Sequence, residues 1–386
     1  MKYKFKIAHI VIAAVNAAAI AGALTLTAFA GSAARSQSYN YAAERWKNDG
    51  DKEYGQVSCY FSEDAGFAKN SALELREKLL AELEKVSIYP TEDYQPILDA
   101  YSASAGTSEL TCDRVGKATA EITAVGGNFF FFHDFDLVSG AFLSEKDLMQ
   151  DGIVIDRQLA WQLYGSDNIV GMNVYINDVK LYISGVIESP HTDPEERCIG
   201  ETPRAYILYD AADMIFGGSS PAAYDGENMG DVKNNFEKIT AYECVVPQPI
   251  ENYAYKTVKN CIGETYKGKM NMVNNSERFK PENRKKAFKK LDEYAIKKDQ
   301  VAYPFWENAS RLVEYKLAVL YGIRRYLIAV PVITLIWLAI KLFIAYNRRK
   351  ERMKKAAARF ISDKWESFRE RSRKNTAQAA DKNANI

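Results

Sequence analysis

The sequence predicts an α+β domain held between two transmembrane helices. Two long apolar segments lie near the ends of the 386-residue chain, and the stretch between them mixes strand-like and helix-like hydrophobic patterns. The mean hydropathy of −0.31 shows that most of the chain is polar, which excludes a channel built from many membrane helices. We therefore expect one large water-exposed domain with a membrane segment on either side.

The first apolar segment follows the lysine-containing start MKYKFK. Residues 7–30 carry no charge apart from the ionisable His9, and about 20 apolar residues are enough to cross a bilayer. These features predict a cytoplasmic N-terminus at 1–6 and a transmembrane helix at 7–30. The same stretch also fits a signal peptide with a cleavage site at Ala28-Phe29-Ala30, although the uncharged run is long for one.

The second apolar segment covers residues 324–346. Tyrosines at positions 326 and 346 bracket its apolar run, as aromatic residues do at membrane interfaces. Lys341 lies five residues from the end, so its ammonium group can extend towards the basic residues that follow. Pro331 lies near the other end, where a kink is tolerated. The segment predicts a second transmembrane helix whether or not the first one is cleaved.

Charge is distributed unevenly along the chain, although its total is only +1. Residues 1–30 and 347–386 carry excess positive charges of 3 and 8, whereas residues 31–323 carry an excess of 13 negative charges. Basic segments beside membrane helices stay in the cytoplasm. We expect a two-pass protein of the cell membrane, with both termini cytoplasmic and residues 31–323 extracytoplasmic. Because topology explains the basic segments, we expect no nucleic-acid partner.

Short strands and amphipathic helices alternate in the predicted extracytoplasmic domain. Residues 71–86 predict a helix whose leucines 73, 75, 79, 80 and 83 share one face, and residues 157–165 predict a helix ended by Gly165. Residues 170–188 are typical of a β-hairpin that turns at Asn177-Asp178. Alternating or short apolar patterns predict further strands at 56–61, 117–126, 152–156, 205–210 and 239–247.

Three other stretches have characteristic compositions. Residues 217–231 are polar and glycine-rich, which predicts a loop or a small insertion. Residues 281–321 are mainly helical in pattern, with a break at Tyr303-Pro304, and run into the second apolar segment. The four phenylalanines at 129–132 favour a buried strand over a partner site, because phenylalanine is usually buried.

No pattern in the sequence predicts catalysis, a cofactor or a metal. The segment 263–270 matches G-x4-G-K, but Met270 stands where a phosphate-binding loop has Ser or Thr, and no hydrophobic strand precedes it. In the 133–136 segment, alternation places His133 and Phe135 on one face and both aspartates on the other. The second acidic segment with a histidine, 191–196, is typical of an exposed loop. We therefore predict that the chain is not an enzyme.

The five cysteines all fall within the predicted extracytoplasmic domain. Their spacing contains no C-x-x-C pair, so the sequence favours neither a metal site nor a redox motif. An odd number leaves at least one thiol unpaired in a monomer. We expect between zero and two disulfides, and the spacing does not select among them.

The segment 347–386 predicts a basic amphipathic helix. Apolar residues recur along one helical face at Met353, Ala357, Phe360, Ile361, Trp365 and Phe368, and the basic residues next to the membrane are Arg348, Arg349, Lys350 and Arg352. Such a helix binds the anionic inner leaflet, where each basic residue contributes about 1 kcal/mol. Docking to a protein partner and a simple role in fixing topology are the alternatives.

Two stretches of the predicted domain resemble a known family. The segment 135–148, FDLVSGAFLSEKDL, is followed by GIVIDRQLAWQLYGSDNIVGMNVYINDVKLYISGVIE at 152–188. Together they are similar to the MacB-like periplasmic core domain of FtsX-type ABC transporter permeases. Residues 242–255, 273–280 and 303–320 further resemble two-span, permease-like proteins of Gram-positive bacteria.

The resemblance implies an extracytoplasmic domain that transmits ATP-driven movement or meets an adaptor protein. Permeases of this family have four spans, whereas this sequence predicts two and contains no ATPase domain. We therefore expect a permease-type subunit that requires an ABC ATPase or a multi-span permease as partner. The alternative is a cell-surface binding or structural protein that reuses the core domain without transport. An extracellular hydrolase is a third and weaker hypothesis.

Overall fold

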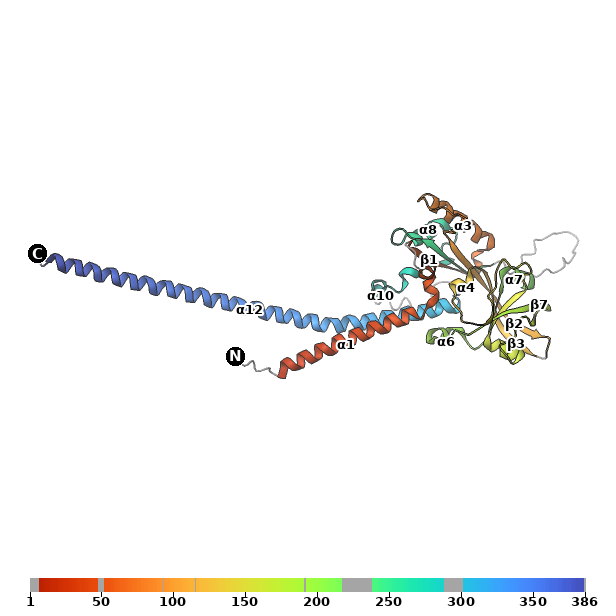
Figure 1. Ribbon diagram of the computed structural model, residues 1–386, viewed down its shortest axis with the longest axis horizontal. Helices are drawn as coiled ribbons and strands as arrows, with labels where there is room; N and C mark the ends of the chain where they lie inside the picture. The colour runs from red at the N-terminus through yellow and green to blue at the C-terminus, as the bar shows by residue number, and fades with distance from the viewer. Residues whose placement is uncertain are drawn as a thin grey trace. The chain divides into compact units, whose positions relative to one another are not determined.

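The computed structural model describes residues 7–47, 52–92, 94–114, 116–190, 192–216, 238–287 and 301–384 (Figure 1). Contacts divide the chain into two compact units. One unit is Ala28–Gly322, and the other combines Met1–Thr27 with Ile323–Ile386. The loop predicted at 217–231 and the histidine at 191 lie outside the described residues.

A mixed β-sheet of ten described strands forms the centre of the Ala28–Gly322 unit. The strands are β1 (Tyr54–Phe61), β2 (Leu98–Cys112), β3 (Lys117–Gly127), β4 (Leu137–Gly140), β5 (Gly152–Asp156), β6 (Asn173–Ile176), β7 (Val179–Ile187), β8 (Arg204–Leu208), β9 (Ala241–Pro247) and β10 (Met270–Asn274). Their order is β10-β1-β9-β2-β3-β8-β5-β7-β4, and β6 pairs with β2 and β7. The pairs β3–β8 and β5–β7 are parallel, and the other pairs are antiparallel. The sheet and its helices confirm the predicted α+β class.

Strand β6 closes part of the sheet into a ring. Its residues 174–176 pair with residues 110–112 of β2, while it also forms a hairpin with β7. Pairing therefore runs continuously through β2, β3, β8, β5, β7 and β6. A β-bulge between Ser104 and Gly106 divides β2 into a first part that pairs with β9 and a second part that pairs with β6. Gly106 has a φ of 78°, a left-handed conformation that glycine adopts without strain.

One face of the sheet packs against four helices. These are α3 (Lys69–Glu84), α5 (Arg157–Tyr164), α7 (Tyr209–Phe216) and α8 (Tyr253–Ile262). In β1, Val57, Cys59 and Phe61 point to this side because alternate residues of a strand face opposite ways. Helices α3 and α8 lie side by side over the β1 end of the sheet (Figure 1). This face contains the larger hydrophobic core.

The opposite face carries a second core that includes the start of the last helix. It contains residues of the short helices η1 (Ser38–Tyr41), α2 (Ala42–Lys47) and α4 (Phe129–Phe132). Phe305 and Trp306, the first residues of α12 (Phe305–Ala384), are buried in the same core. Residues that precede β1 and residues that follow the last strand are thus packed together on one side of the sheet.

Most of the predicted local elements are confirmed. The helix predicted at 71–86 is α3, the one at 157–165 is α5, and Gly165 ends it with a φ of 69°. The hairpin turns at Asn177 and Asp178, whose φ values of 46° and 66° are those of a tight two-residue turn. The break at Tyr303-Pro304 directly precedes α12.

Two local predictions are wrong. Phe129–Phe132 form the short helix α4 instead of a strand, although Phe129 and Phe132 are buried as expected. Glycines at 126 and 127 end β3 just before this run, and Gly127 has a φ of 62°. The predicted apolar face of α3 includes Leu73, yet this residue is 46% exposed because the buried stripe runs through Leu75, Leu79 and Leu83.

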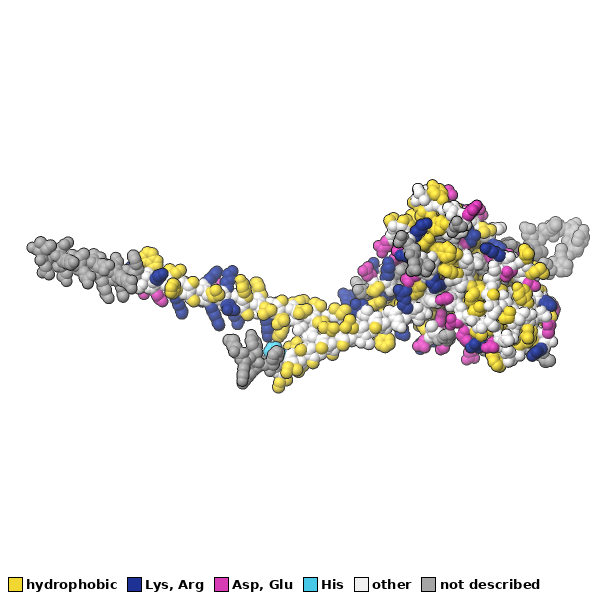
Figure 2. Space-filling model, viewed as in Figure 1, with side chains coloured by type: hydrophobic (Ala, Val, Ile, Leu, Met, Phe, Trp, Pro, Cys, Tyr) yellow, Lys and Arg dark blue, Asp and Glu magenta, His cyan; other side chains and the backbone are white. Residues whose placement is uncertain are grey.

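Within the described ranges, two helices are long and apolar enough to cross a membrane: α1 (Ile7–Arg35) and α12. Their apolar side chains form nearly continuous stretches, and Lys and Arg side chains gather along α12 beyond its apolar part (Figure 2). In the unit that contains most of both helices, Gly22 faces Leu327. A Cβ atom on Gly22 would lie 3.2 Å from Leu327 Cδ1, so glycine permits a close helix–helix approach here.

Replacing Leu79 with alanine tests the larger core. Leu79 is fully buried in α3, so L79A should lower the free energy of unfolding by about 2–5 kcal/mol. The matched control L73A removes the same atoms from an exposed site and should change stability by about 0.5 kcal/mol or less. Urea titration of the detergent-solubilised chain measures both, and equal effects would contradict this packing.

Thiol reactivity tests the burial of the cysteines, all five of which are unpaired. Burial raises the pKa of Cys59 and of Cys244, which lie on neighbouring strands, and it also raises the pKa of the half-buried Cys198 and Cys261. Only the thiolate reacts, so a raised pKa lowers the reactive fraction at pH 8.

With N-ethylmaleimide at pH 8, Cys198 and Cys261 should be modified slowly in the folded protein, and faster as the pH rises. Cys59 and Cys244 should remain unmodified until the chain unfolds. Peptide mass spectrometry measures the labelling, and urea-unfolded protein is the control. Rapid labelling of Cys244 in the folded chain would contradict the structure.

Candidate functional site

Three distant chain segments meet in a buried polar cluster on the second face of the sheet. The cluster, called here the helix anchor, consists of Asn40, Arg278, Glu307, Ser310 and Glu314. Asn40 follows α1, Arg278 ends α9 (Asn275–Arg278), and the other three residues lie in the first turns of α12. The Asn40 side-chain amide donates to Ser310 Oγ at 2.8 Å, and its carbonyl oxygen accepts from Arg278 Nη1 at 3.0 Å.

Arg278 is the centre of the helix anchor. Its two terminal nitrogens donate to the two carboxylate oxygens of Glu307, each at 2.8 Å, in a bidentate pair. Its Nε lies 3.3 Å from Glu314 Oε1. The side chains of Arg278 and Glu307 are 2% and 0% exposed. A pair buried this completely is held in one geometry because neither partner can turn to water instead.

Two further arginines surround the same carboxylates. Arg311 Nε donates to Glu307 Oε1 at 2.8 Å, and its guanidinium lies 3.6 Å from the centre of the Tyr303 ring. Arg284, in α10 (Pro281–Ala287), approaches Glu314 Oε1 at 2.9 Å. Burial alone would lower the pKa of Arg278 and Arg311, but the neighbouring carboxylates more than offset it, so both pKa values are raised. The guanidinium groups therefore stay charged at any physiological pH.

The anchor is attached to the sheet through Gln56 of β1. The Gln56 side-chain carbonyl accepts from the Ala42 backbone N–H at 2.8 Å, and its amide donates to the Tyr39 carbonyl at 2.7 Å. The Gln56 backbone N–H donates to Ser276 Oγ at 2.9 Å. One buried residue thus joins the segment after α1, the segment around α9 and a strand inside the sheet.

A second buried polar group joins β9 to α12. His133 Nε2 lies 2.7 Å from Glu243 Oε2, and Ser58 Oγ donates to Glu243 Oε1 at 2.9 Å. The His133 ring stacks on Phe129 at 4.2 Å and contacts Trp306 at 4.5 Å, both measured between ring centres. Ser58 donates to the carboxylate and not to the imidazole, so this arrangement does not activate a nucleophile.

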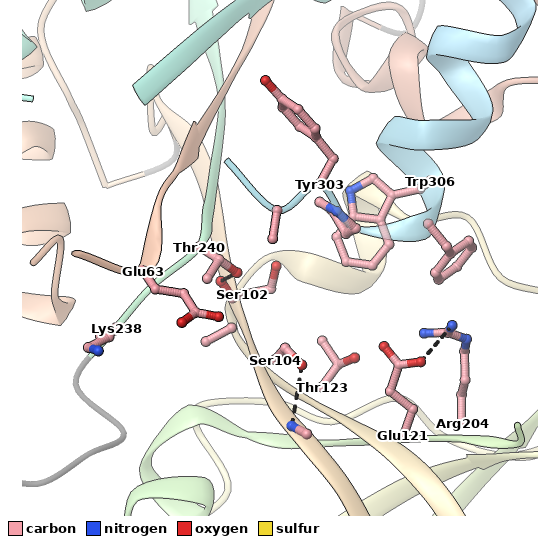
Figure 3. Close-up of a pocket in the computed structure, with 15 residues that line it drawn as sticks. Glu63, Ser102, Ser104, Glu121, Thr123, Arg204, Lys238, Thr240, Tyr303 and Trp306 are labelled. Carbon is pink, nitrogen blue, oxygen red and sulfur yellow. Dashed lines mark hydrogen bonds and ion pairs between the residues drawn. The ribbon is translucent and has the colours of Figure 1, made fainter. Parts of the chain in front are cut away.

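A cavity of about 480 Å³ lies between the sheet and the segment that leads into α12. Hydroxyl side chains of the sheet lie on one side of it, while Tyr303 and Trp306 lie on the other (Figure 3). Charged residues of both signs also border it. At its edge Arg204 is paired with Glu121 at 2.9 Å and lies over the Phe305 ring, 4.6 Å from its centre.

The family description "MacB-like periplasmic core domain" matches residues 10–238, which is more than half of the chain. The chain belongs to this family. The match begins inside α1 and ends before β9, so the later part of the MacB-like protein supplies β9, β10 and most of the helix anchor. Among curated proteins, the sequence has no match.

Several solved structures, including the following three, are similar to this chain. The periplasmic region of MacB from Actinobacillus actinomycetemcomitans has 15% identity and a TM-score of 0.37, and the match covers 57% of this chain and 89% of that one. The extracellular domain of the noncanonic ABC-type transporter YknZ from Gram-positive bacteria has 10% identity and a TM-score of 0.36, with coverages of 57% and 100%. A domain of a putative permease from Porphyromonas gingivalis has 12% identity and a TM-score of 0.32, with coverages of 57% and 88%.

The proposed docking residues of the C-terminal segment lie on α12. Helix α12 continues without a break from Phe305 to Ala384, so no helix end separates the predicted membrane span from the segment 347–386. The side chains of Phe360, Ile361 and Trp365 are exposed, as are those of the basic residues at 348–350 and 352. The side chain of Phe368 lies outside the described residues.

The other candidate sites are not assembled by the MacB-like fold. His133 is buried while Asp134 and Asp136 are exposed, as alternation predicted, and no cluster of three metal-ligating side chains occurs among the described residues. Gly263 follows the helix α8 and not a strand, so the segment 263–270 does not form a phosphate-binding loop.

Sequence reasoning missed the helix anchor. A signal for it exists, because Glu307, Ser310, Arg311 and Glu314 share one helical face with the buried Val313 and Leu317. Charged residues on an apolar helix face indicate buried partners. Those partners, Asn40 and Arg278, are 270 and 29 residues from their respective contacts in α12, so no local pattern identifies them.

Replacing Glu307 with glutamine tests the helix anchor of the MacB-like domain. E307Q removes one charge of the buried pair and should lower the free energy of unfolding by about 3–5 kcal/mol. The matched control is E44Q, which breaks the exposed pair with Arg35 and should cost about 1 kcal/mol or less. Urea titration of the full chain in detergent measures both, and similar small losses would contradict the anchor.

Proposed function

We propose that this chain is a membrane-anchored, permease-type subunit of an ABC transport complex. Its extracytoplasmic domain transmits a conformational change or docks a partner, and another chain supplies ATP hydrolysis. The family membership and two helices of membrane-spanning length support this proposal. We propose no catalytic role for the chain itself.

The observation that carries the proposal is the helix anchor. The segment that follows α1 and the first turns of α12 are bound to each other through Asn40 and Ser310, and both are bound to Arg278. A displacement of either segment would therefore act on the same buried cluster. Gln56 connects that cluster to the sheet, so the displacement would be transmitted to the strands instead of being lost in a flexible linker.

The proposed topology places residues 1–6 in the cytoplasm, 7–30 and 324–346 in the membrane, and 31–323 outside. Residues 347–386 return to the cytoplasm as a basic segment. The positive-inside rule supports this orientation, since the basic excess lies at both ends of the chain. In this orientation the MacB-like domain is extracytoplasmic, where an adaptor protein would meet it.

The C-terminal part of α12 is proposed to bind the anionic inner leaflet or a cytoplasmic partner. Its apolar residues at 353, 360, 361 and 365 are all more than half exposed, and basic residues surround them. The partner we propose is an ABC ATPase, a multi-span permease that brings one, or both. Nucleic acid is not among the proposed partners.

Co-purification tests the proposal. The tagged full-length chain, extracted in mild detergent and analysed by native mass spectrometry, should carry a stoichiometric ABC ATPase or a multi-span permease. A chain that is isolated alone or only as a homo-oligomer would contradict the transport proposal. The domain would then be a surface binding or structural module.

The basic segment of α12 has its own test in the same experiment. Replacing the four basic residues at 348–350 and 352 with glutamine removes four positive charges and should weaken retention of the partner or of anionic lipid at least tenfold. Glutamine at Lys78 and Lys85, two exposed lysines of the extracytoplasmic domain, is the control and should change nothing. Equal retention by both variants would show that these charges serve topology only.

A further inference from the structure

The cavity in Figure 3 lies on the face of the sheet that also carries α4 and the start of α12. Its floor comes from neighbouring strands in register, because Ser104 pairs with Thr123 and Glu121 pairs with Arg204. Directly paired residues point to the same side of a sheet. Its roof is the segment 302–306, which ends in the first two residues of α12. Its volume of about 480 Å³ lies within the range of small-molecule sites.

Hydroxyl groups dominate the floor. Ser102, Ser104, Thr123 and Thr240 all line the cavity, and each hydroxyl both donates and accepts hydrogen bonds. Such a surface suits peptide groups, which present an N–H donor and a C=O acceptor at every residue. Thr240 Oγ1 donates to the Ser102 carbonyl and Ser104 Oγ accepts from the Gly106 N–H, so each keeps further hydrogen-bonding capacity that a polar, extended molecule can use.

Charges of opposite sign stand at two places along the cavity. Glu63 and Lys238 lie near each other on one side, and the Glu121–Arg204 pair lies on the other (Figure 3). A molecule with one ammonium and one carboxylate group finds a complementary charge at either position. A neutral sugar has no charged group to pair with these side chains, whereas a peptide with free termini has an ammonium group at one end and a carboxylate at the other.

Two buried donors at this cavity have no hydrogen-bond partner among the described residues. They are Nε of Arg204 and Nε1 of Trp306, whose residues are 5% and 3% exposed. Buried donors are satisfied in nearly all native structures. Both residues line the cavity, but the two nitrogen atoms are themselves covered, so a ligand reaches them only after the side chains move.

We infer that this cavity binds a short peptide with charged, free termini. The peptide lies over the hydroxyl floor, and its termini meet the two charged positions. Because Trp306 is the second residue of α12, an occupied cavity restrains the start of that helix. This inference goes beyond the proposed transport role and does not depend on an ATPase partner.

Isothermal titration of the full-length, detergent-solubilised chain tests it, with trialanine as probe. Trialanine should bind saturably. N-acetyl-trialanine amide, which lacks both terminal charges, should bind at least tenfold more weakly, and maltotriose should not bind. Absence of saturation, equal binding of the blocked peptide, or binding of maltotriose alone would each overturn the inference.

Two variants locate the binding. S104W fills the cavity from an exposed position of β2 and should abolish binding, whereas T107W adds the same side chain to an exposed position of that strand outside the cavity and should not. K238Q removes an exposed charge and should weaken binding about tenfold. Thermal unfolding verifies that each variant is folded. Unchanged affinity in both S104W and K238Q would place the peptide elsewhere and overturn the site.

Discussion

The buried pair between Arg278 and Glu307 is the interaction on which the arrangement of this MacB-like domain depends. Removing two charges from water costs several kcal/mol per ion, so such a pair persists only where geometry and additional hydrogen bonds are nearly ideal. Here the pair is bidentate, and Asn40, Arg311 and Glu314 complete its shell. Its effect is to specify one position for three chain segments that are far apart in sequence.

That pair connects a single sheet to the segments beside both candidate membrane helices. The region that matches the family ends at residue 238, yet β9 inserts between β1 and β2 and completes the sheet. The chain then returns past β1 as β10 and reaches α9 and α12. The C-terminal part is thus integral to the fold, because the sheet and the anchor both require it.

The second face of the sheet brings three features together. The helix anchor, the His133–Glu243 pair and the hydroxyl-lined cavity all contact the first turns of α12 or the segment just before them. The polar groups of the anchor and the His133–Glu243 pair are buried and bonded to one another, whereas the hydroxyl and charged groups of the cavity border open space. A rigid connection beside an open polar cavity is a suitable arrangement for coupling a bound molecule to a helix.

The sequence by itself determined the elements whose causes are local. The 170–188 hairpin follows from an Asn-Asp turn between alternating strands, α5 ends at a glycine that accepts a left-handed conformation, and α1 and α12 follow from long apolar runs. The family resemblance at 135–188 rests on the same local patterns, which is why it could be recognised before the fold was known.

Only the tertiary structure decided the remainder. Strand β2 is built largely from Ala, Ser, Thr and Gly, so it lacks the hydrophobic alternation that marks a strand, and its pairing with β3, β6 and β9 defines it. Arg278 resembles an ordinary surface residue in sequence, and the alternation around His133 does not reveal its partner. Their roles come from Glu307 and Glu243, which long-range folding brings within 3 Å. Local pattern cannot predict such contacts, because the partner is chosen by the whole fold.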